Sequence, residues 1–221
     1  MKFIYGVDIQ NDFMNKDGRL YVEGAEEIKP KINAINVFAR QLNIRRVFSR
    51  DRHFPNDDEF LIFPKHCMDR QYASKNEKGN YGIDLISEAG LGDFDTVQYK
   101  VGLNETIQYG KKDIRRFGRL EKDLILEKQD YSVFSNSNAK KVLDRLRTSY
   151  DGVVVYGVAT NFCVLEATMG LQNLGFQTYL LEDAIAGVPD NFEHIGIEDA
   201  INKMVDNGTI LTRTEDLTRL F

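Results

Sequence analysis

The feature that most constrains the fold of this chain is a regular alternation between short apolar runs and longer segments with apolar residues every three or four positions. Apolar runs that are polar only at their ends are typical of strands covered on both faces of a parallel sheet. The longer spacing is typical of amphipathic helices. The alternation predicts a doubly wound α/β fold with right-handed crossovers. The expected strands are Phe3–Val7, Arg46–Ser49, Leu124–Leu126, Val153–Val158, Thr178–Leu181 and a weaker Thr209–Thr212, and the expected helices are Glu26–Leu42, Ala139–Arg147, Phe162–Leu174 and Asn191–Asn207.

Two stretches interrupt this alternation. Residues Phe54–Gly92 are polar and rich in turn-forming residues, and Val101–Glu121 is a charged segment with helical character. Long irregular connections in a compact α/β domain are often binding loops or lids. The length of 221 residues fits one domain. We therefore expect a single domain over residues 1–221, in which residues 101–121 are an insertion that forms a lid or a subunit contact.

Charge and cysteine content argue against several classes of protein. With 29 Lys and Arg against 34 Asp and Glu, the net charge of -5 does not favour a nucleic-acid-binding surface. No apolar run is long enough to cross a membrane, and Asp8 interrupts the first run too early for a signal peptide. Only two cysteines occur, which indicates free thiols in a reducing compartment. We expect a cytoplasmic protein with no nucleic-acid or membrane partner.

Chemically competent side chains gather at the ends of four expected strands. Asp8 follows the first strand, Asp51 and His53 follow the second, Lys128 follows the third, and Cys163 comes soon after the fourth. In this class of fold, ligands bind beyond the carboxyl ends of the strands. We therefore expect these side chains to share one edge of the sheet. That edge lacks a glycine-rich dinucleotide motif, and the chain contains no P-loop motif.

Cys163 is the candidate nucleophile, because it begins an expected helix after a glycine-containing turn. The N-terminus of a helix lowers a thiol pKa and offers N–H groups to an oxyanion. Asp8 is then the candidate proton acceptor, and Lys128 would stabilise negative charge and orient Asp8. Each residue has a simpler interpretation: a small buried side chain for Cys163, a turn cap for Asp8 and a solvated charge for Lys128. His194 lies in an expected helix, and we expect it on the surface.

Asp51, His53 and His66 form a candidate metal site. Two of the three histidines in the chain lie within this window of sequence. Carboxylate oxygen and imidazole nitrogen are suitable ligands for Zn²⁺ and similar ions, and three protein ligands leave positions open for water or substrate. The spacing alone also occurs by chance, so it does not establish a metal site.

These motifs, taken together and in order, resemble those of the nicotinamidases in the isochorismatase-like cysteine hydrolase superfamily. The resemblance extends over nearly the whole chain, and the segment around Cys163 is its most specific part. Several motifs in the same order make chance similarity a poor explanation. The matching segments are Val7–Phe13, Ser49–His53, Phe63–Cys67, Lys128, Gly157–Val164 and Leu181–Ala184 followed by Gly187.

The resemblance implies a fold and a catalytic apparatus. It implies a three-layer α/β/α domain with a six-stranded, mostly parallel sheet. The catalytic triad would be Asp8, Lys128 and Cys163. The Val158–Ala159 peptide bond would be cis, and the N–H groups of Ala159 and Cys163 would form the oxyanion hole. Related proteins are commonly homo-oligomers, which we also expect here.

The resemblance also implies a substrate and a cofactor. A divalent metal, with Zn as the first choice and Fe or Mn as alternatives, would be held by Asp51, His53 and His66. Phe13 and Phe63 would contact the substrate, although core packing is an equally good explanation for Phe13. The implied reaction cleaves nicotinamide, or a related heteroaromatic amide, to the acid and ammonia through a thioester on Cys163.

Several departures from the family pattern bear on the substrate. Nicotinamidases usually have Trp at the positions of Arg52 and Phe63, and their loop between His53 and His66 is usually longer. The segment Val101–Glu121 resembles an insertion. We expect all of these near the pocket, where they put the identity of the amide in doubt more than the mechanism.

Other functions remain as alternatives. The first is an amidase or ureidohydrolase of the same superfamily that acts on another small amide. Isochorismate hydrolysis fits less well, because relatives with that activity do not use this set of metal ligands. The third is a non-catalytic binding protein on the same fold, since a fold does not guarantee a function. Competent residues at every triad and ligand position argue against it.

Overall fold

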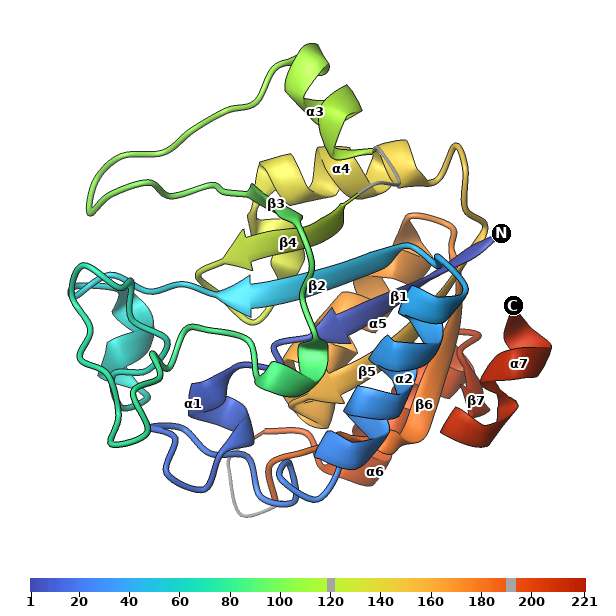
Figure 1. Ribbon diagram of the computed structural model, residues 1–221, viewed down its shortest axis with the longest axis horizontal. Coiled ribbons are helices and arrows are strands. Elements are labelled where there is room, and N and C mark those ends of the chain that lie inside the picture. The colour runs from blue at the N-terminus through green and yellow to red at the C-terminus, as the bar shows by residue number, and fades with distance from the viewer. Residues whose placement is uncertain (119–121, 190–193) are drawn as a thin grey trace.

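The chain forms a three-layer α/β/α domain in a computed structural model that describes residues 1–118, 122–189 and 194–221. A seven-stranded sheet lies at the centre, in the order β3-β4-β2-β1-β5-β6-β7, and every neighbouring pair is parallel (Figure 1). This confirms the predicted α/β class. The strands are β1 (Lys2–Val7), β2 (Arg46–Asp51), β3 (Phe94–Val97), β4 (Asp123–Lys128), β5 (Gly152–Val158), β6 (Gln177–Ala186) and β7 (Ile210–Thr212).

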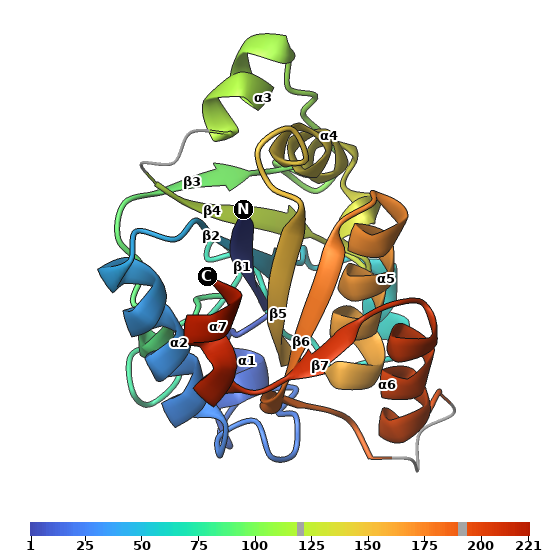
Figure 2. The same cartoon turned by 90° about the vertical axis from the view of Figure 1, so that its right-hand side faces the viewer.

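Helices cover both faces of the sheet, as a doubly wound topology requires. Figure 2 shows α2 and α7 on one side, with α4, α5 and α6 on the other. Successive strands are added on the β2 side of β1 first and from β5 onwards on its other side, so the order of the sheet switches at β1. Because all strands are parallel, the carboxyl ends of the central strands lie at one edge, beside this switch point. The helices are α1 (Asn11–Met14), α2 (Lys29–Gln41), α3 (Lys111–Phe117), α4 (Ser137–Leu146), α5 (Leu165–Asn173), α6 (Ile197–Asp206) and α7 (Leu217–Leu220).

The sheet has one strand more than the six that we expected. The additional strand is β3, which is only four residues long and forms an edge of the sheet. Its first residue, Phe94, is exposed, and Asp95 follows it, so the segment lacks the continuous apolar run of a central strand. β3 was missed because an edge strand is covered less completely than its neighbours.

All four expected helices differ from the observed bounds, and the starts of two of them differ in ways that affect the site. The helix expected from Asn191 begins as α6 at Ile197, so His194 precedes it and is not helical. Residues 191–193 of that prediction, and residues 119–121 of the expected insertion, lie outside the described residues. The helix expected from Phe162 starts instead with a π-helical turn, Thr160–Val164, which continues into α5.

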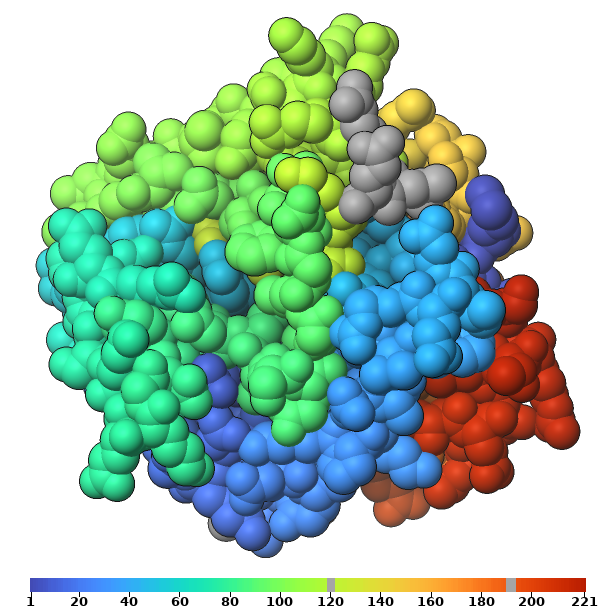
Figure 3. All heavy atoms as spheres, in the orientation of Figure 1, coloured from blue at the N-terminus to red at the C-terminus, as the bar shows by residue number. Residues whose placement is uncertain are grey.

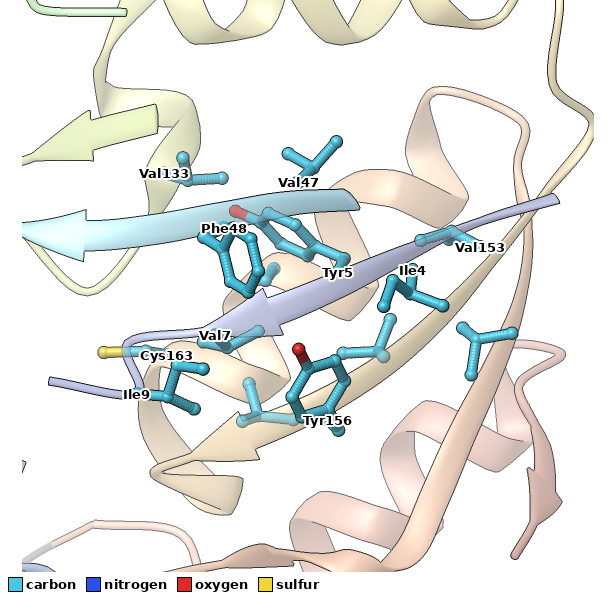
Figure 4. Packing of buried hydrophobic residues seen from close by; sticks show 14 of the residues in the cluster. Ile4, Tyr5, Val7, Ile9, Val47, Phe48, Val133, Val153, Tyr156 and Cys163 are labelled. Atoms are coloured by element: carbon cyan, nitrogen blue, oxygen red, sulfur yellow. The ribbon is translucent and has the colours of Figure 1, made fainter. Parts of the chain in front are cut away.

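The central strands pack closely enough to require glycine at two positions. A Cβ on Gly6 in β1 would lie 2.8 Å from the ring of Phe48 and 2.8 Å from the hydroxyl oxygen of Tyr156, on the neighbouring strands β2 and β5. Gly157, near the end of β5, has φ +120, and a Cβ there would lie 2.1 Å from the carbonyl oxygen of Val7. These contacts bring the ends of β1 and β5 together. In Figure 4 the Cys163 sulfur consequently lies close to the end of β1.

The two long connections lie at the same side of the molecule. Residues 52–93 connect β2 to β3 and include two short 3₁₀ helices, Asp58–Leu61 and Ser87–Ala89. Residues 98–110 leave β3 and lead to α3, which packs on α4. In Figure 3 the surfaces of the two connections meet. Within the described part of the chain, none of the helices has the length and apolar character needed to cross a membrane.

Candidate active site

Lys128 contacts both of the other residues of the expected catalytic triad, Asp8 and Cys163. Its Nζ lies 2.9 Å from Asp8 Oδ2 and 3.4 Å from Cys163 Sγ. The same ammonium group pairs with the carboxylate of Asp51 and donates to the Asp130 carbonyl oxygen at 2.9 Å. Lys128 is 1% exposed, so it is not the solvated strand-end charge of the simpler interpretation. Although burial disfavours its charged form, Asp51 and Asp8 hold the pKa of Lys128 well above its ordinary value.

Asp8 lies beside the thiol, with a carboxylate oxygen within 4.8 Å of Cys163 Sγ. It directly follows β1 with a φ of 46, and its carboxylate accepts a hydrogen bond from Ser49 Oγ at 2.6 Å. Its backbone N–H donates to the same hydroxyl oxygen at 3.3 Å. Burial raises the pKa of Asp8, while Lys128 opposes the rise. The carboxylate therefore accepts a proton more readily than an exposed aspartate does.

Cys163 lies in the π-helical turn between β5 and α5 and is almost fully buried. The Val158–Ala159 peptide bond, just before this turn, is cis, as the resemblance implies. The expected lowering of the thiol pKa by a helix N-terminus is wrong. Burial raises the pKa of Cys163 well above its ordinary value; Lys128 opposes this, and Asp8 and Asp51 add to it. A thiolate would therefore form only as its proton passes to a nearby acceptor.

A second cluster, of possible metal ligands, consists of Asp51, His53, Glu59 and His66. One ligand atom from each lies within 4.8 Å of the others. His53 Nε2 lies 3.9 Å from Asp51 Oδ2 and 3.7 Å from Glu59 Oε2. His66 Nε2 lies 3.6 Å from Glu59 Oε1. We call this set the metal-ligand cluster.

The two histidines of the metal-ligand cluster each have one ring nitrogen engaged and the other free. His66 Nδ1 donates to the Pro64 carbonyl oxygen at 2.8 Å, and His53 Nδ1 lies 3.3 Å from a carboxylate oxygen of Asp57. Nε2 of both rings is buried and has no hydrogen-bond partner among the described residues. A buried polar atom without a partner is costly, and coordination of an ion removes that cost. The donors present thus fit a divalent metal such as Zn²⁺.

Glu59 is the member of the metal-ligand cluster that the sequence did not single out. It lies in the 3₁₀ helix Asp58–Leu61, and burial together with the nearby Asp51 raises its pKa to about 7. The only signal in the sequence is the acidic run Asp57–Glu59 between the two histidines. An irregular segment has no periodicity to show which acid faces inward, so this signal could not distinguish Glu59 from its neighbours.

A cavity of about 130 Å³ adjoins both clusters. Because a single water molecule needs roughly 10–15 Å³ on the same measure, the cavity is large enough for a small molecule with a single ring. Phe13 and Phe63, the two expected substrate contacts, lie in its wall, and their rings lie 5.4 Å and 6.5 Å from that of His66. Residues of the described insertion 101–118 do not line it. The lining residues are Phe13, Leu20, Tyr21, Val22, Asp51, Glu59, Phe63, His66, Tyr131, Val158, Ala159, Phe162, Cys163 and Val188.

Three aromatic residues of this wall, Tyr21, Tyr131 and Phe162, were not predicted from the sequence. Tyr131 and Phe162 lie with ring centroids 5.4 Å apart, and Phe63 approaches both at 6.2 Å and 6.4 Å. His194 is exposed, as expected, and its ring stacks on Phe162 at 4.1 Å. Part of the cavity wall is therefore aromatic, and it adjoins the metal-ligand cluster where Phe63 approaches His66.

Arg52 does not line the cavity, contrary to expectation. Its guanidinium group donates to Asp69 Oδ2 at 2.7 Å and to Glu127 Oε2 at 3.0 Å. It also lies over the ring of Phe54, with 5.2 Å between the guanidinium carbon and the ring centroid. Arg52 is thus directed away from the site, and its difference from the family pattern does not change the cavity wall.

Two solved structures are among those that share this fold. One is pyrazinamidase of Pyrococcus horikoshii in complex with zinc, with 23% sequence identity, a TM-score of 0.67 and coverage of 96% of this chain and 98% of that chain. The other is N-carbamoylsarcosine amidase from Thermoplasma acidophilum, with 20% identity, a TM-score of 0.68 and 98% coverage of both chains. At these identities the similarity extends to the fold alone.

Sequence comparison with curated relatives and with a family model identifies the family of this chain. Isochorismatase family protein 1A of Dictyostelium discoideum is 26% identical over 144 residues, which are 64% of this chain and 65%, slightly less than two thirds, of the relative. Nicotinamidase of Saccharomyces cerevisiae is 26% identical over 204 residues, covering 88% of this chain and 92% of that protein. The model of the isochorismatase domain matches residues 4–216. The chain therefore belongs to the isochorismatase family.

Proposed function

We propose that this chain is a metal-dependent cysteine amidohydrolase that cleaves nicotinamide, or a closely related heteroaromatic amide, to the acid and ammonia. The observation that carries the proposal is the position of Lys128 Nζ, which contacts Asp8 and Cys163 Sγ, while Cys163 itself lines a small cavity. A nucleophile, a proton acceptor and a cation that orients both are the parts that acyl transfer requires.

The reaction begins with transfer of the thiol proton of Cys163 to Asp8 while sulfur attacks the carbonyl carbon of the amide. The N–H groups of Ala159 and Cys163 hold the resulting oxyanion. The C–N bond then breaks, and the nitrogen takes the proton from Asp8 and leaves as ammonia. A thioester between Cys163 and the acyl group remains.

Water completes the cycle. Asp8 removes a proton from water as its oxygen attacks the thioester carbon, and the C–S bond breaks. The proton on Asp8 returns to sulfur, the carboxylic acid leaves, and the enzyme regains its first state. The raised pKa of the buried Asp8 suits a group that both takes up and returns a proton. Lys128 stays charged and keeps the carboxylate oriented towards sulfur.

The metal would be held by Asp51, His53 and His66, with Glu59 as a fourth ligand. When bound, a divalent ion, Zn²⁺ first and Fe²⁺ or Mn²⁺ as alternatives, supplies a Lewis acid for a heteroaromatic nitrogen of the substrate. The proposal is supported by the cavity lining, because Asp51 and His66 line the same cavity as Cys163 and one small molecule there would contact both clusters. Phe13 and Phe63 would then flank its ring.

Ammonia release tests this proposal. Purified protein is assayed with nicotinamide as isolated, after chelation and after return of Zn²⁺, Fe²⁺ or Mn²⁺. We expect release that is lost on chelation and restored by metal. Release from another small amide or an N-carbamoyl compound, with none from nicotinamide, would keep the cysteine hydrolase and replace the substrate. No release from any amide by metal-loaded protein would overturn the proposed activity.

The proposal also carries three predictions about context. We propose that residues 1–221 act as one hydrolase domain in the cytoplasm, where cleavage of nicotinamide would feed NAD salvage. Both cysteines are free and buried, which supports a reducing compartment. We propose that the chain forms a homo-oligomer, and light scattering on the purified protein would measure its mass in solution.

A further inference from the structure

The loop after β2 places a carboxylate directly behind His53. The carboxylate of Asp57 lies 3.3 Å from His53 Nδ1 and accepts the backbone N–H of Phe54 at 2.8 Å. The Asp57 N–H in turn donates to the Phe54 carbonyl oxygen at 3.0 Å, so the loop closes on itself. The Asp57 side chain is 7% exposed. It lies on the side of His53 away from the free Nε2.

Lys100 pairs with the other oxygen of the same carboxylate. Its Nζ contacts Asp57 Oδ1, and it lies over the ring of the buried Phe54 at 5.0 Å. Lys100 comes from the segment that follows β3, whereas Asp57 comes from the segment that follows β2. The ion pair therefore connects the two long connections whose surfaces meet in Figure 3.

The backbone around Lys100 is fixed by its own hydrogen bonds. The Val101 N–H donates to the Glu105 carbonyl oxygen at 2.9 Å, and the Ile107 N–H donates to the Tyr99 carbonyl oxygen at 2.8 Å. These backbone hydrogen bonds give residues 99–107 a hairpin-like shape. The Lys100 carbonyl oxygen accepts from Arg52 at 3.1 Å. Arg52, which lies outside the cavity wall, thus anchors the base of this excursion beside the metal-ligand cluster.

We propose that Asp57 and Lys100 are positioning residues of the metal site, through which the segment after β3 controls metal affinity. The inference rests on the metal site of the proposed function. Asp57 holds the His53 ring with its proton on Nδ1, so that Nε2 presents its lone pair to the metal. Lys100 holds the Asp57 carboxylate in place and balances its charge.

The two histidines differ in this support. His66 donates to a neutral backbone carbonyl two residues away in its own loop, whereas His53 has a carboxylate that is paired in turn with a distant lysine. A carboxylate behind a ligating histidine raises the basicity of the ring and fixes its orientation, and its loss typically weakens metal binding about 10-fold to 100-fold. We therefore expect substitutions of Asp57 to weaken metal binding although Asp57 is not itself a metal ligand.

Metal affinity of purified variants tests the proposal without substrate. Apo protein is titrated with Zn²⁺ against a chromophoric chelator, and Co²⁺ absorption spectra report the ligand geometry. The variants are Asp57→Asn, which keeps an acceptor for Phe54, and Lys100→Met, with Lys100→Arg as the conservative change. Lys78→Met is the matched control, because Lys78 forms an ion pair with Asp17 at 3.3 Å and contacts no member of the metal-ligand cluster.

We expect Asp57→Asn to weaken Zn²⁺ binding about 10-fold to 100-fold and Lys100→Met about threefold to tenfold. Lys100→Arg should keep most of the Zn²⁺ affinity, and Lys78→Met should leave the affinity unchanged. The double variant Asp57→Asn/Lys100→Met should bind Zn²⁺ no worse than Asp57→Asn alone, because Lys100 acts through Asp57. Wild-type affinity in folded Asp57→Asn and Lys100→Met proteins would overturn the positioning role. If wild-type protein binds no divalent metal at all, the metal site of the proposed function and this inference both fail. If wild-type protein binds the metal and the variants bind it equally well, only this inference fails.

Discussion

The nucleophile group and the metal-ligand cluster lie side by side but are built differently. Asp8 directly follows β1, Lys128 is the last residue of β4, and Cys163 lies in the π-helical turn after β5; the ammonium group of Lys128 contacts both other side chains. Of the metal ligands, only Asp51 belongs to a strand, whereas Glu59 and His66 lie in the irregular segment 52–93. The first group is held by the sheet. The second depends on loop contacts, so we expect it to respond more strongly to changes outside the site.

Residues at the end of β1 connect the two halves. The Gln10 side chain accepts from the Asp51 N–H at 2.7 Å and donates to the Asp51 carbonyl oxygen at 2.9 Å. The Asp12 carboxylate accepts the Cys67 N–H at 2.6 Å, directly after His66. The segment after β1 therefore holds both ends of residues 51–67, the stretch that contains the metal-ligand cluster.

The largest expected effect is on turnover in Cys163→Ala. Removal of a nucleophile typically lowers kcat by about 10⁴-fold or more, whereas the fold and the metal affinity should remain, since a small side chain replaces another. Cys67→Ala removes the other buried thiol and serves as the control. Ammonia release and Zn²⁺ titration on both variants make the comparison. Wild-type kcat in Cys163→Ala would show that sulfur is not the nucleophile.

The largest effect on stability is expected for Lys128→Met. The change leaves the buried carboxylates of Asp8 and Asp51 without their common partner, and loss of one member of a buried ion pair costs about 3–5 kcal/mol. Lys122→Met, at an exposed lysine before the same strand, should cost far less. Urea denaturation measures the free energy of unfolding of both variants. An equal, small loss in the two would mean that Lys128 does not hold the nucleophile group together.

A smaller effect, confined to the metal half, is expected for Glu59→Gln. Loss of the fourth ligand's charge should weaken Zn²⁺ binding roughly tenfold, with little change in the free energy of unfolding of the apo protein. Asp58→Asn changes the exposed neighbour in the same 3₁₀ helix and is the control. Chelator competition measures both affinities. If the two variants bind Zn²⁺ equally well, Glu59 is not a ligand.

The smallest effect is expected for Phe63→Leu, which changes the cavity wall and leaves both clusters intact. A shorter, non-aromatic side chain should raise KM about threefold to tenfold, in line with about 1 kcal/mol for a ring contact, with kcat nearly unchanged. Steady-state ammonia release gives both constants, and Phe94→Leu at the exposed sheet edge is the control. A fall in kcat at constant KM would place Phe63 in the chemical step instead.

The same contrast explains how much could be predicted from the sequence. Strand ends follow from apolar runs, so Asp8, Lys128 and Asp51 were found from periodicity, and the α/β class was predicted correctly. Glu59, Asp57 and Lys100 lie in irregular segments, where no period shows which side chains face inward. β3 was missed because an edge strand is only partly buried. The pKa of the Cys163 thiol is raised and not lowered as predicted, because burial and the nearby carboxylates of Asp8 and Asp51 disfavour the thiolate.

The most direct test of the account is mass spectrometry of metal-loaded protein that is quenched in acid during its first turnover with nicotinamide. The account predicts an acyl group on the peptide that contains Cys163, absent from chelated protein and from Cys163→Ala. Ammonia release at the full rate with no acyl group on Cys163, or with the acyl group on another residue, would contradict it.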